Sequence, residues 1–262
     1  MPKDCPQSSQ CAWPEPPFYG SQSKSENIRI VFSIILSVLI SIGVSAQSGS
    51  KQLKREKPDL EKIRLETLDS HSPYYYPRLM KEFQRNDTLM KIDKYRHLYL
   101  GYMFQEDYNP YRSSQRDIQY NVLDRSRKLT RQECDSVIMY AEKALADNPF
   151  NLGEMVMLIK ALREKGKNNL ANIWQYKLNY LLMAIVSTGT GEDEENAWYV
   201  IEPQHEYVLL NMMDYSVADH VFYDPSYEYI TVKDSNGKSR GGFYFNIGPL
   251  LREYYRKHPD EL

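Results

Sequence analysis

The chain has 262 residues, 33 basic against 35 acidic side chains, and a formal net charge of −2 at pH 7. This balance gives no electrostatic support for binding to nucleic acid or to an anionic membrane, and three cysteines are too few for a disulfide scaffold. The length and the plentiful aliphatic and aromatic residues allow a buried core and exclude a wholly disordered chain. The most unusual feature is 22 tyrosines against 8 phenylalanines.

The first segment, residues 1–29, is rich in proline, otherwise polar, and without hydrophobic periodicity. We expect it to be a disordered extension, or to precede the true start of translation. An uncharged apolar run, Ile30–Val44, follows and ends in small residues at Ala46. The run is shorter than the roughly 20 residues of a membrane-spanning helix, so residues 30–46 are predicted to be the apolar region and cleavage site of a secretory signal. An uncleaved anchor and a buried core helix are the alternatives.

Cleavage after Ala46 would deliver the mature chain to the periplasm or outer envelope, whereas retention of residues 30–44 would leave a single-pass membrane anchor. Cleavage would also leave Cys134 as the only cysteine, so no intramolecular disulfide is expected. The polar residues 47–57 are interpreted as a linker. Residues 58–262 are predicted to form a single domain, with a helical part at 58–187 and a β-rich part with a terminal helix at 188–262.

The first half of that domain carries helical periodicity. Pro58 and Asp59 are a favourable opening for a helix, and apolar residues at i, i+3, i+4 and i+7 begin at Tyr76 and again near Ile92. The Asn109-Pro110 pair is predicted to end the helix that begins near Ile92.

A second helical block begins at Thr130. Thr130 and Glu133 have the spacing of a capping box, in which each side chain accepts a hydrogen bond from the other residue's backbone N–H. The helix is predicted to end at Asp147-Asn148-Pro149, followed by helices at Leu152–Arg163 and between Leu170 and Ile185. Because the connections are short, these helices are predicted to form antiparallel hairpins.

The sequence becomes β-rich after a Gly-x-Gly turn at Gly189–Gly191. The runs rich in β-branched and aromatic residues are Trp198–Ile201, Tyr207–Leu210, Tyr227–Val232 and Phe243–Ile247. The Asn236-Gly237 pair signals a tight turn, so the last two strands are predicted to extend to Lys233 and Lys238. With a closing helix at Pro249–Lys257, the sequence predicts an α+β fold of helical hairpins, a small antiparallel sheet and a C-terminal helix.

One segment of the helical part resembles a known repeat. Lys143–Asn151 is similar to the end of a tetratricopeptide repeat, where a small–large pair packs and a proline starts the next helix pair. The similarity covers one degenerate repeat over residues 137–185, and at least three repeats are normal for a free-standing array. It therefore favours helix-hairpin packing more than peptide binding.

The chain as a whole resembles a family of uncharacterised envelope proteins from Bacteroidota, the domain of unknown function family 4919. The stretches that carry the resemblance are Ser72–Pro77, Tyr95–Tyr99, Phe104–Tyr111, Ser187–Gly191, Tyr199–Ile201, Glu206-Tyr207 and Gly242–Gly248. The likeness spans nearly all of residues 72–257. It implies an exported protein of unknown activity, and it supplies no catalytic residues.

Three patterns that suggest phosphate or metal binding fail on inspection. The Gly189–Gly191 turn lacks the lysine of a phosphate loop and is followed by the acidic run Glu192–Glu195, which repels phosphate. That acidic run lacks the spacing of a calcium loop. His205-Glu206 begins like a zinc-protease helix, but Leu209 occupies the position of the second ligand and the segment is β-like. No metal and no cofactor is expected.

The most enzyme-like cluster is Asp219-His220 near Asp224, because a histidine beside carboxylates can act as a general base. It defines the alternative function, an envelope hydrolase that uses these three residues with His205 or His97. Against it, no nucleophile elbow is present, and adjacent residues of a strand point to opposite faces. Cys134, in the first turn of its helix, is expected to be a buried small residue rather than a reactive thiol.

The tyrosines supply the preferred binding hypothesis. Aromatic rings beside carboxylates and amides are typical of sites that hold sugars or peptides. The candidate ligand-binding residues lie around one predicted turn and are Tyr74, Tyr75, Tyr108, Tyr111, Glu106 and Asp107. Core packing is the alternative, as helical spacing indicates for Tyr95, Tyr99 and Tyr102. The sequence therefore predicts an exported, non-enzymatic binding or structural protein whose partner is an envelope protein or a glycan.

Overall fold

The computed structural model describes residues 53–87, 89–112, 128–223 and 226–261. The predictions for residues 1–29 and 30–46, and those for most of the linker, lie outside these ranges. The first helices are α2 (Leu60–Leu68), α3 (Tyr76–Gln84) and α4 (Ile92–Gly101), which continues as the 3-10 turn η1 (Tyr102–Phe104). The predicted start of α2 is confirmed, because the Asp59 carboxylate accepts a hydrogen bond from the Lys62 backbone N–H at 3.0 Å.

The helix that begins at Ile92 ends earlier than predicted. It stops at Gly101, and after the turn η1 the backbone is extended at Gln105, well before Asn109-Pro110. The Gln105 side-chain amide folds back and donates to the Gly101 carbonyl at 3.1 Å. A local side chain thus satisfies the last carbonyls of this helix, and the proline lies in the loop beyond it.

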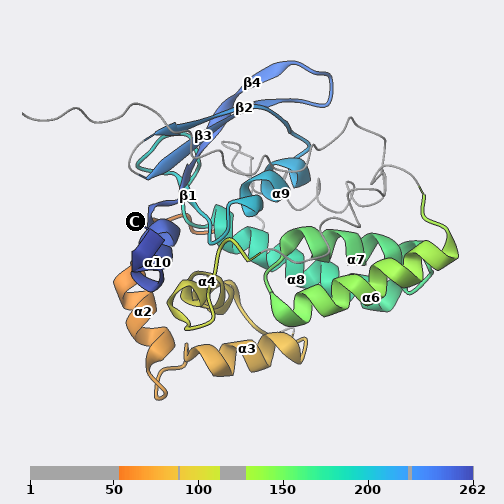
Figure 1. The fold of residues 1–262 in the computed structure, drawn as a ribbon, viewed down its shortest axis with the longest axis horizontal. Coiled ribbons are helices and arrows are strands. Elements are labelled where there is room, and N and C mark those ends of the chain that lie inside the picture. Colours follow the sequence, from red (N-terminus) through yellow and green to blue (C-terminus); the bar gives the residue numbers. More distant parts are fainter. Residues whose placement is uncertain (1–52, 88, 113–127, 224–225, 262) are drawn as a thin grey trace, which may run out of the picture.

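The predicted helical hairpins are present as α6 (Arg131–Asp147), α7 (Leu152–Glu164) and α8 (Asn168–Val186). The capping box is confirmed, with Glu133 N donating to Thr130 Oγ1 at 3.3 Å and Thr130 N donating to Glu133 Oε2 at 2.7 Å. Gly166 makes the α7–α8 turn at φ 78°, a conformation that favours glycine. Helix α7 packs against both α6 and α8, and α4 packs against α8 (Figure 1).

The strands form one sheet in the order β1-β4-β3-β2. Their bounds are β1 (Trp198–Tyr199), β2 (Ser216–Tyr223), β3 (Tyr227–Lys233) and β4 (Ser239–Asn246). The hairpin at Asn236-Gly237 is confirmed, and the Asp234 carboxylate fastens it by accepting from the backbone N–H groups of Asn236 and Lys238. The sheet is mixed rather than purely antiparallel, because β1 pairs with β4 in parallel. A strand this short gives no sequence signal for the direction of its partner.

The predicted strand at Tyr207–Leu210 is wrong, because this segment lies in helix α9 (Gln204–Met212). A short apolar run is compatible with a buried strand or a buried helix, so periodicity alone does not decide between them. Pro203 directly precedes the helix at φ −58°, and this fixed φ suits a helix start. In Figure 1, α9 lies between the sheet and the hairpin helices.

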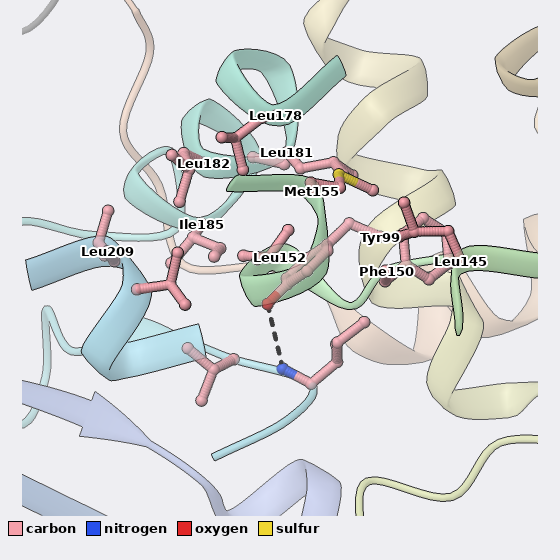
Figure 2. Packing of buried hydrophobic residues seen from close by; sticks show 14 of the residues in the cluster. Tyr99, Leu145, Phe150, Leu152, Met155, Leu178, Leu181, Leu182, Ile185 and Leu209 are labelled. Carbon is pink, nitrogen blue, oxygen red and sulfur yellow. Dashed lines mark hydrogen bonds between the residues drawn. The ribbon is translucent and has the colours of Figure 1, made fainter. Parts of the chain in front are cut away.

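A continuous core joins the helical and β-rich parts. Figure 2 shows Tyr99 and Phe150 packed near Leu152 and Met155, and a dashed line marks the hydrogen bond that the Ile201 N–H donates to the Tyr99 hydroxyl at 3.3 Å. The chain closes with α10 (Gly248–Lys257) and the 3-10 turn η2 (Pro259–Glu261). Among the described residues, no helix is both long enough and apolar enough to cross a membrane.

Candidate functional site

Part of the predicted tyrosine site is buried. Tyr108 is only 2% exposed, and its hydroxyl donates to the Ile201 carbonyl at 2.6 Å. It therefore fixes the loop after η1 to the β-rich part and leaves no open ring face for a ligand, which corrects its place among the stacking candidates. Tyr74 is half-buried and stacks on His97 with ring centroids 3.8 Å apart, and Tyr111 meets Tyr254 edge-on at 4.8 Å.

The charged members of the predicted site line a surface hollow of about 490 Å³. Its lining residues come from the loop after η1 and from the C-terminal end of the chain: Phe104, Glu106, Asp107, Tyr108, Asn109, Arg112, Arg256, Lys257 and His258. The Lys257 ammonium donates to the Gln105 carbonyl and lies 3.4 Å from the Tyr108 carbonyl. The structure thus gathers Glu106 and Asp107 with basic residues that the sequence hypothesis missed, while Tyr74, Tyr75 and Tyr111 lie outside the lining.

A larger hollow, of about 540 Å³, lies between α3, α6 and α8; we call it the helix groove. Most of its lining residues are aromatic or aliphatic, and carboxylates are among the others. The described residues that line it are Tyr76, Met80, Phe83, Gln84, Asn86, Tyr102, Asp107, Glu142, Leu145, Ala146, Asp147, Pro149, Leu170, Ile173, Trp174 and Lys177. Ligand sites are usually concave, largely apolar and furnished with few polar groups. The helix groove has this composition and size.

Lys177 is the most unusual residue of the helix groove. It is only 5% exposed, and its Nζ lies 4.6 Å from the centroids of both the Phe83 and the Trp174 rings. No hydrogen bond or ion pair joins its ammonium to a residue that the structure describes. Burial lowers the pKa of Lys177 to about 8. The lysine is thus a buried cation held by two ring faces, without an anionic partner.

His205 belongs to a buried polar network that fastens α9 to the α6–α7 corner. Its Nδ1 accepts from the Tyr99 hydroxyl at 2.7 Å, and its Nε2 donates to the Phe150 carbonyl at 2.9 Å. The Glu202 carboxylate accepts from the Asn148 side-chain amide at 2.8 Å. Because both ring nitrogens of His205 already have partners inside the core, this histidine acts in packing and not as a general base.

The neighbouring residue of α9, Glu206, is completely buried, and neither of its carboxyl oxygens has a hydrogen-bond donor. Burial raises the pKa of Glu206 well above its ordinary value, and the neighbouring Glu228 carboxyl on β3 raises it further. Burial and the nearby Glu228 carboxyl therefore both favour the neutral form of Glu206.

The histidine–aspartate cluster does not form a cleft with the other histidines. Asp219 and His220 are exposed on the edge strand β2, where the Asp219 carboxylate accepts from the His220 backbone N–H at 2.9 Å. Asp224 lies outside the described residues. His97 on α4 is held by Glu66 at 2.8 Å and by the Asp93 carbonyl at 2.7 Å. Within the described ranges, no three histidine, cysteine or acidic side chains gather to hold a metal ion.

In the Gly-x-Gly turn after α8, two backbone N–H groups that a phosphate would need already have a partner in the chain. The N–H groups of Thr190 and Gly191 both donate to the Asn196 carbonyl, at 3.0 and 2.8 Å. A Cβ on Gly189 would lie 2.1 Å from that same oxygen, so only glycine fits there. The turn is structural, as predicted. Cys134 is also buried as predicted, and burial raises the pKa of its thiol.

A family model for a domain of unknown function, DUF4919, matches residues 61–256. The chain belongs to this family. No curated protein and no solved structure matches the chain. The matched residues include both the helical and the β-rich part, and the family description names no activity.

Proposed function

We propose that this DUF4919 chain is an exported, non-enzymatic binding protein of the bacterial cell envelope, and that the helix groove holds its ligand. The observation that carries the proposal is an open hollow of about 540 Å³ in which the nearly buried Lys177 has no anionic partner within the described part of the chain. A buried cation without a counter-charge is unfavourable, and a bound ligand can supply that charge.

Binding is favoured over catalysis because most of the lining of the helix groove is contact surface. It includes aromatic and aliphatic side chains such as Phe83, Trp174 and Leu145. Hydrolysis needs a nucleophile or activated water next to a general base. The candidate base His220 is exposed on β2, away from the residues that line either hollow.

The exported location is supported by the sequence before the domain. The apolar run Ile30–Val44 and the small residues that end at Ala46 are typical of a secretory signal. The resemblance to envelope proteins of Bacteroidota agrees with an exported protein, and the tetratricopeptide-like segment at residues 137–185 agrees with the packed helical hairpins that form part of the helix groove.

The binding proposal is tested by blocking the helix groove. The variant Met80→Arg places a long charged side chain in its lining, whereas Met139→Arg places the same side chain on an exposed position of α6. Each purified protein is incubated with envelope extract, and native mass spectrometry measures the bound mass. We expect ligand on the wild type and on Met139→Arg but not on Met80→Arg. Equal binding by all three proteins, or binding by none, would overturn the proposal.

The export proposal has its own test. The protein is recovered from the envelope fraction of the source cells and its N-terminus is sequenced. We expect Gln47 as the first residue. A chain that keeps residues 30–44 and pellets with membranes would instead support the single-pass anchor, and a full-length chain in the cytosol would reject export.

A further inference from the structure

Building on the proposed function, we infer that Lys177 receives the C-terminal carboxylate of a peptide whose last side chain is apolar and which carries a basic residue upstream. The Lys177 ammonium lies against two aromatic rings, and aliphatic and acidic side chains line the same hollow.

The Lys177 ammonium has aromatic neighbours but, among the described residues, lacks the anionic acceptor that a buried cation also requires. The rings of Phe83 and Trp174 each attract it through their faces, at 4.6 Å. Aromatic faces replace only part of the hydration that burial removes, and an anionic acceptor would replace the rest. Because Lys177 lines the hollow, a ligand that enters the helix groove can place its anion on this ammonium.

The other charged residues that line the helix groove favour a ligand whose anionic group carries a single charge. Asp107, Glu142 and Asp147 line the same hollow, with Asp147 paired to Arg112 at 3.5 Å, and Lys177 is the only basic residue among the described lining residues. Phosphate and sulfate groups are usually bound by several donors, such as arginine forks, and the carboxylates of Asp107 and Glu142 would repel a multiply charged ligand. A carboxylate carries one charge and matches one ammonium.

The aliphatic lining of the helix groove favours a peptide over a sugar as the ligand. Met80, Leu170 and Ile173 offer aliphatic surface next to Lys177, which suits an apolar side chain. A sugar ring would place hydroxyl groups against this aliphatic part of the helix groove, where they would lack hydrogen-bond partners. The carboxylates of the helix groove instead complement a positive charge elsewhere on the ligand, which a basic residue near a peptide terminus supplies and a fatty acid does not.

The test uses a defined probe and the full chain. The peptide acetyl-Arg-Ala-Ala-Leu is titrated with its free C-terminal carboxylate and, separately, as the C-terminal amide. We expect the free acid to bind at pH 7 and the amide to bind at least about tenfold more weakly, because only the acid forms a charge-assisted hydrogen bond with Lys177. Octanoate serves as the fatty-acid arm and is expected to bind more weakly than the free acid.

Two variants and a change of pH complete the test. Lys177→Met is expected to remove the preference for the free acid, whereas Lys143→Met, at an exposed lysine of α6, leaves it unchanged. The preference should also fall when the pH is raised from 7 to 9.5, since the pKa of the free Lys177 is about 8. The acid–amide comparison uses the wild-type chain, so the inference can be tested even if Lys177→Met does not fold.

The outcomes separate this inference from the proposed function. Equal affinities for acid and amide, tighter binding of octanoate, or no binding of the free acid would overturn the peptide-terminus inference. If Met80→Arg still abolishes binding of the envelope ligand in those cases, the helix groove remains a binding site for another class of ligand. If the envelope ligand does not depend on Met80, the proposed function itself fails.

Discussion

At the residue scale, two buried ionisable groups of the described residues, Lys177 and Glu206, have different surroundings. Lys177 lines the helix groove and lies between two rings. Glu206 is wholly buried, with the carboxyl of Glu228 nearby. Burial penalises the charged form of both, so it lowers the pKa of the lysine and raises the pKa of the glutamate.

Glu206 makes the stability of the fold depend on pH. Its pKa is raised on folding, so between its ordinary value and the folded value the native state binds more protons than the unfolded state, and stability falls as pH rises. Glu206→Gln removes this titration. We expect its stability relative to wild type to grow as pH rises from 5 to 8, with a slope of up to about 1.4 kcal/mol per pH unit. Urea unfolding at several pH values measures this.

The matched control for that series is Glu142→Gln, at an exposed glutamate of α6. It should keep the pH dependence of the wild type. A constant stability difference between Glu206→Gln and wild type from pH 5 to 8 would show that Glu206 is already ionised in the fold.

The Tyr99 hydroxyl has two partners in the core, since it donates to His205 and accepts from the Ile201 N–H. Tyr99→Phe keeps the ring but leaves both partners unsatisfied, which costs about 1–3 kcal/mol for a buried polar group. The free energy of unfolding from urea denaturation measures this loss. Tyr75→Phe, at a half-buried ring, should change stability by less than about 0.5 kcal/mol. Equal losses for the two variants would contradict the network.

At the element scale, local signals predicted structure well and long-range ones did not. The capping box at Thr130 and the Asn236-Gly237 turn involve residues close in sequence, and both are present. The parallel pairing of β1 with β4 joins distant segments, and the helix α9 differs from a buried strand only in its surroundings. Sequence pattern contains neither piece of information.

The same contrast between local and long-range information applies to the candidate site. Glu106 and Asp107 are adjacent in sequence and line one hollow, whereas the helix groove needs α3, α6 and α8 to come together. One feature of the sequence does point to the helix groove. Lys177 falls on the apolar stripe of α8 that includes Leu178 and Leu181, and a charge on a buried stripe requires a special environment.

The contact between α2 and α4 depends on a glycine. A Cβ on Gly101 would lie 2.6 Å from Thr67 Cγ2, so Gly101→Ala forces the helices apart or the threonine out of its position. We expect a loss of about 1–3 kcal/mol, the usual cost of overpacking. Thr67→Ser removes that methyl group while keeping the hydroxyl that donates to the Ile63 carbonyl. The double variant should recover much of the loss in thermal unfolding, and simple additivity would contradict this close approach.

At the scale of the whole molecule, polar contacts tie the helical part to the β-rich part at several places. Tyr108 donates to the Ile201 carbonyl, Asn148 to Glu202, and Tyr99 to His205 at 2.7 Å. The apolar core is continuous across the same boundary. These contacts favour one domain over two separately stable units, and the single domain at residues 58–262 stays a prediction.

This continuity predicts a single unfolding transition. The chain has three tryptophans, and the double variant Trp13→Phe/Trp174→Phe leaves Trp198, on β1, to report on the sheet. Far-ultraviolet circular dichroism reports mainly on the helices of the same sample. Because each part buries apolar surface on the other, neither should remain folded alone, and the two signals should give the same urea midpoint. Separate midpoints, with the Trp198 signal lost first, would mean that the helical part and its groove fold without the sheet.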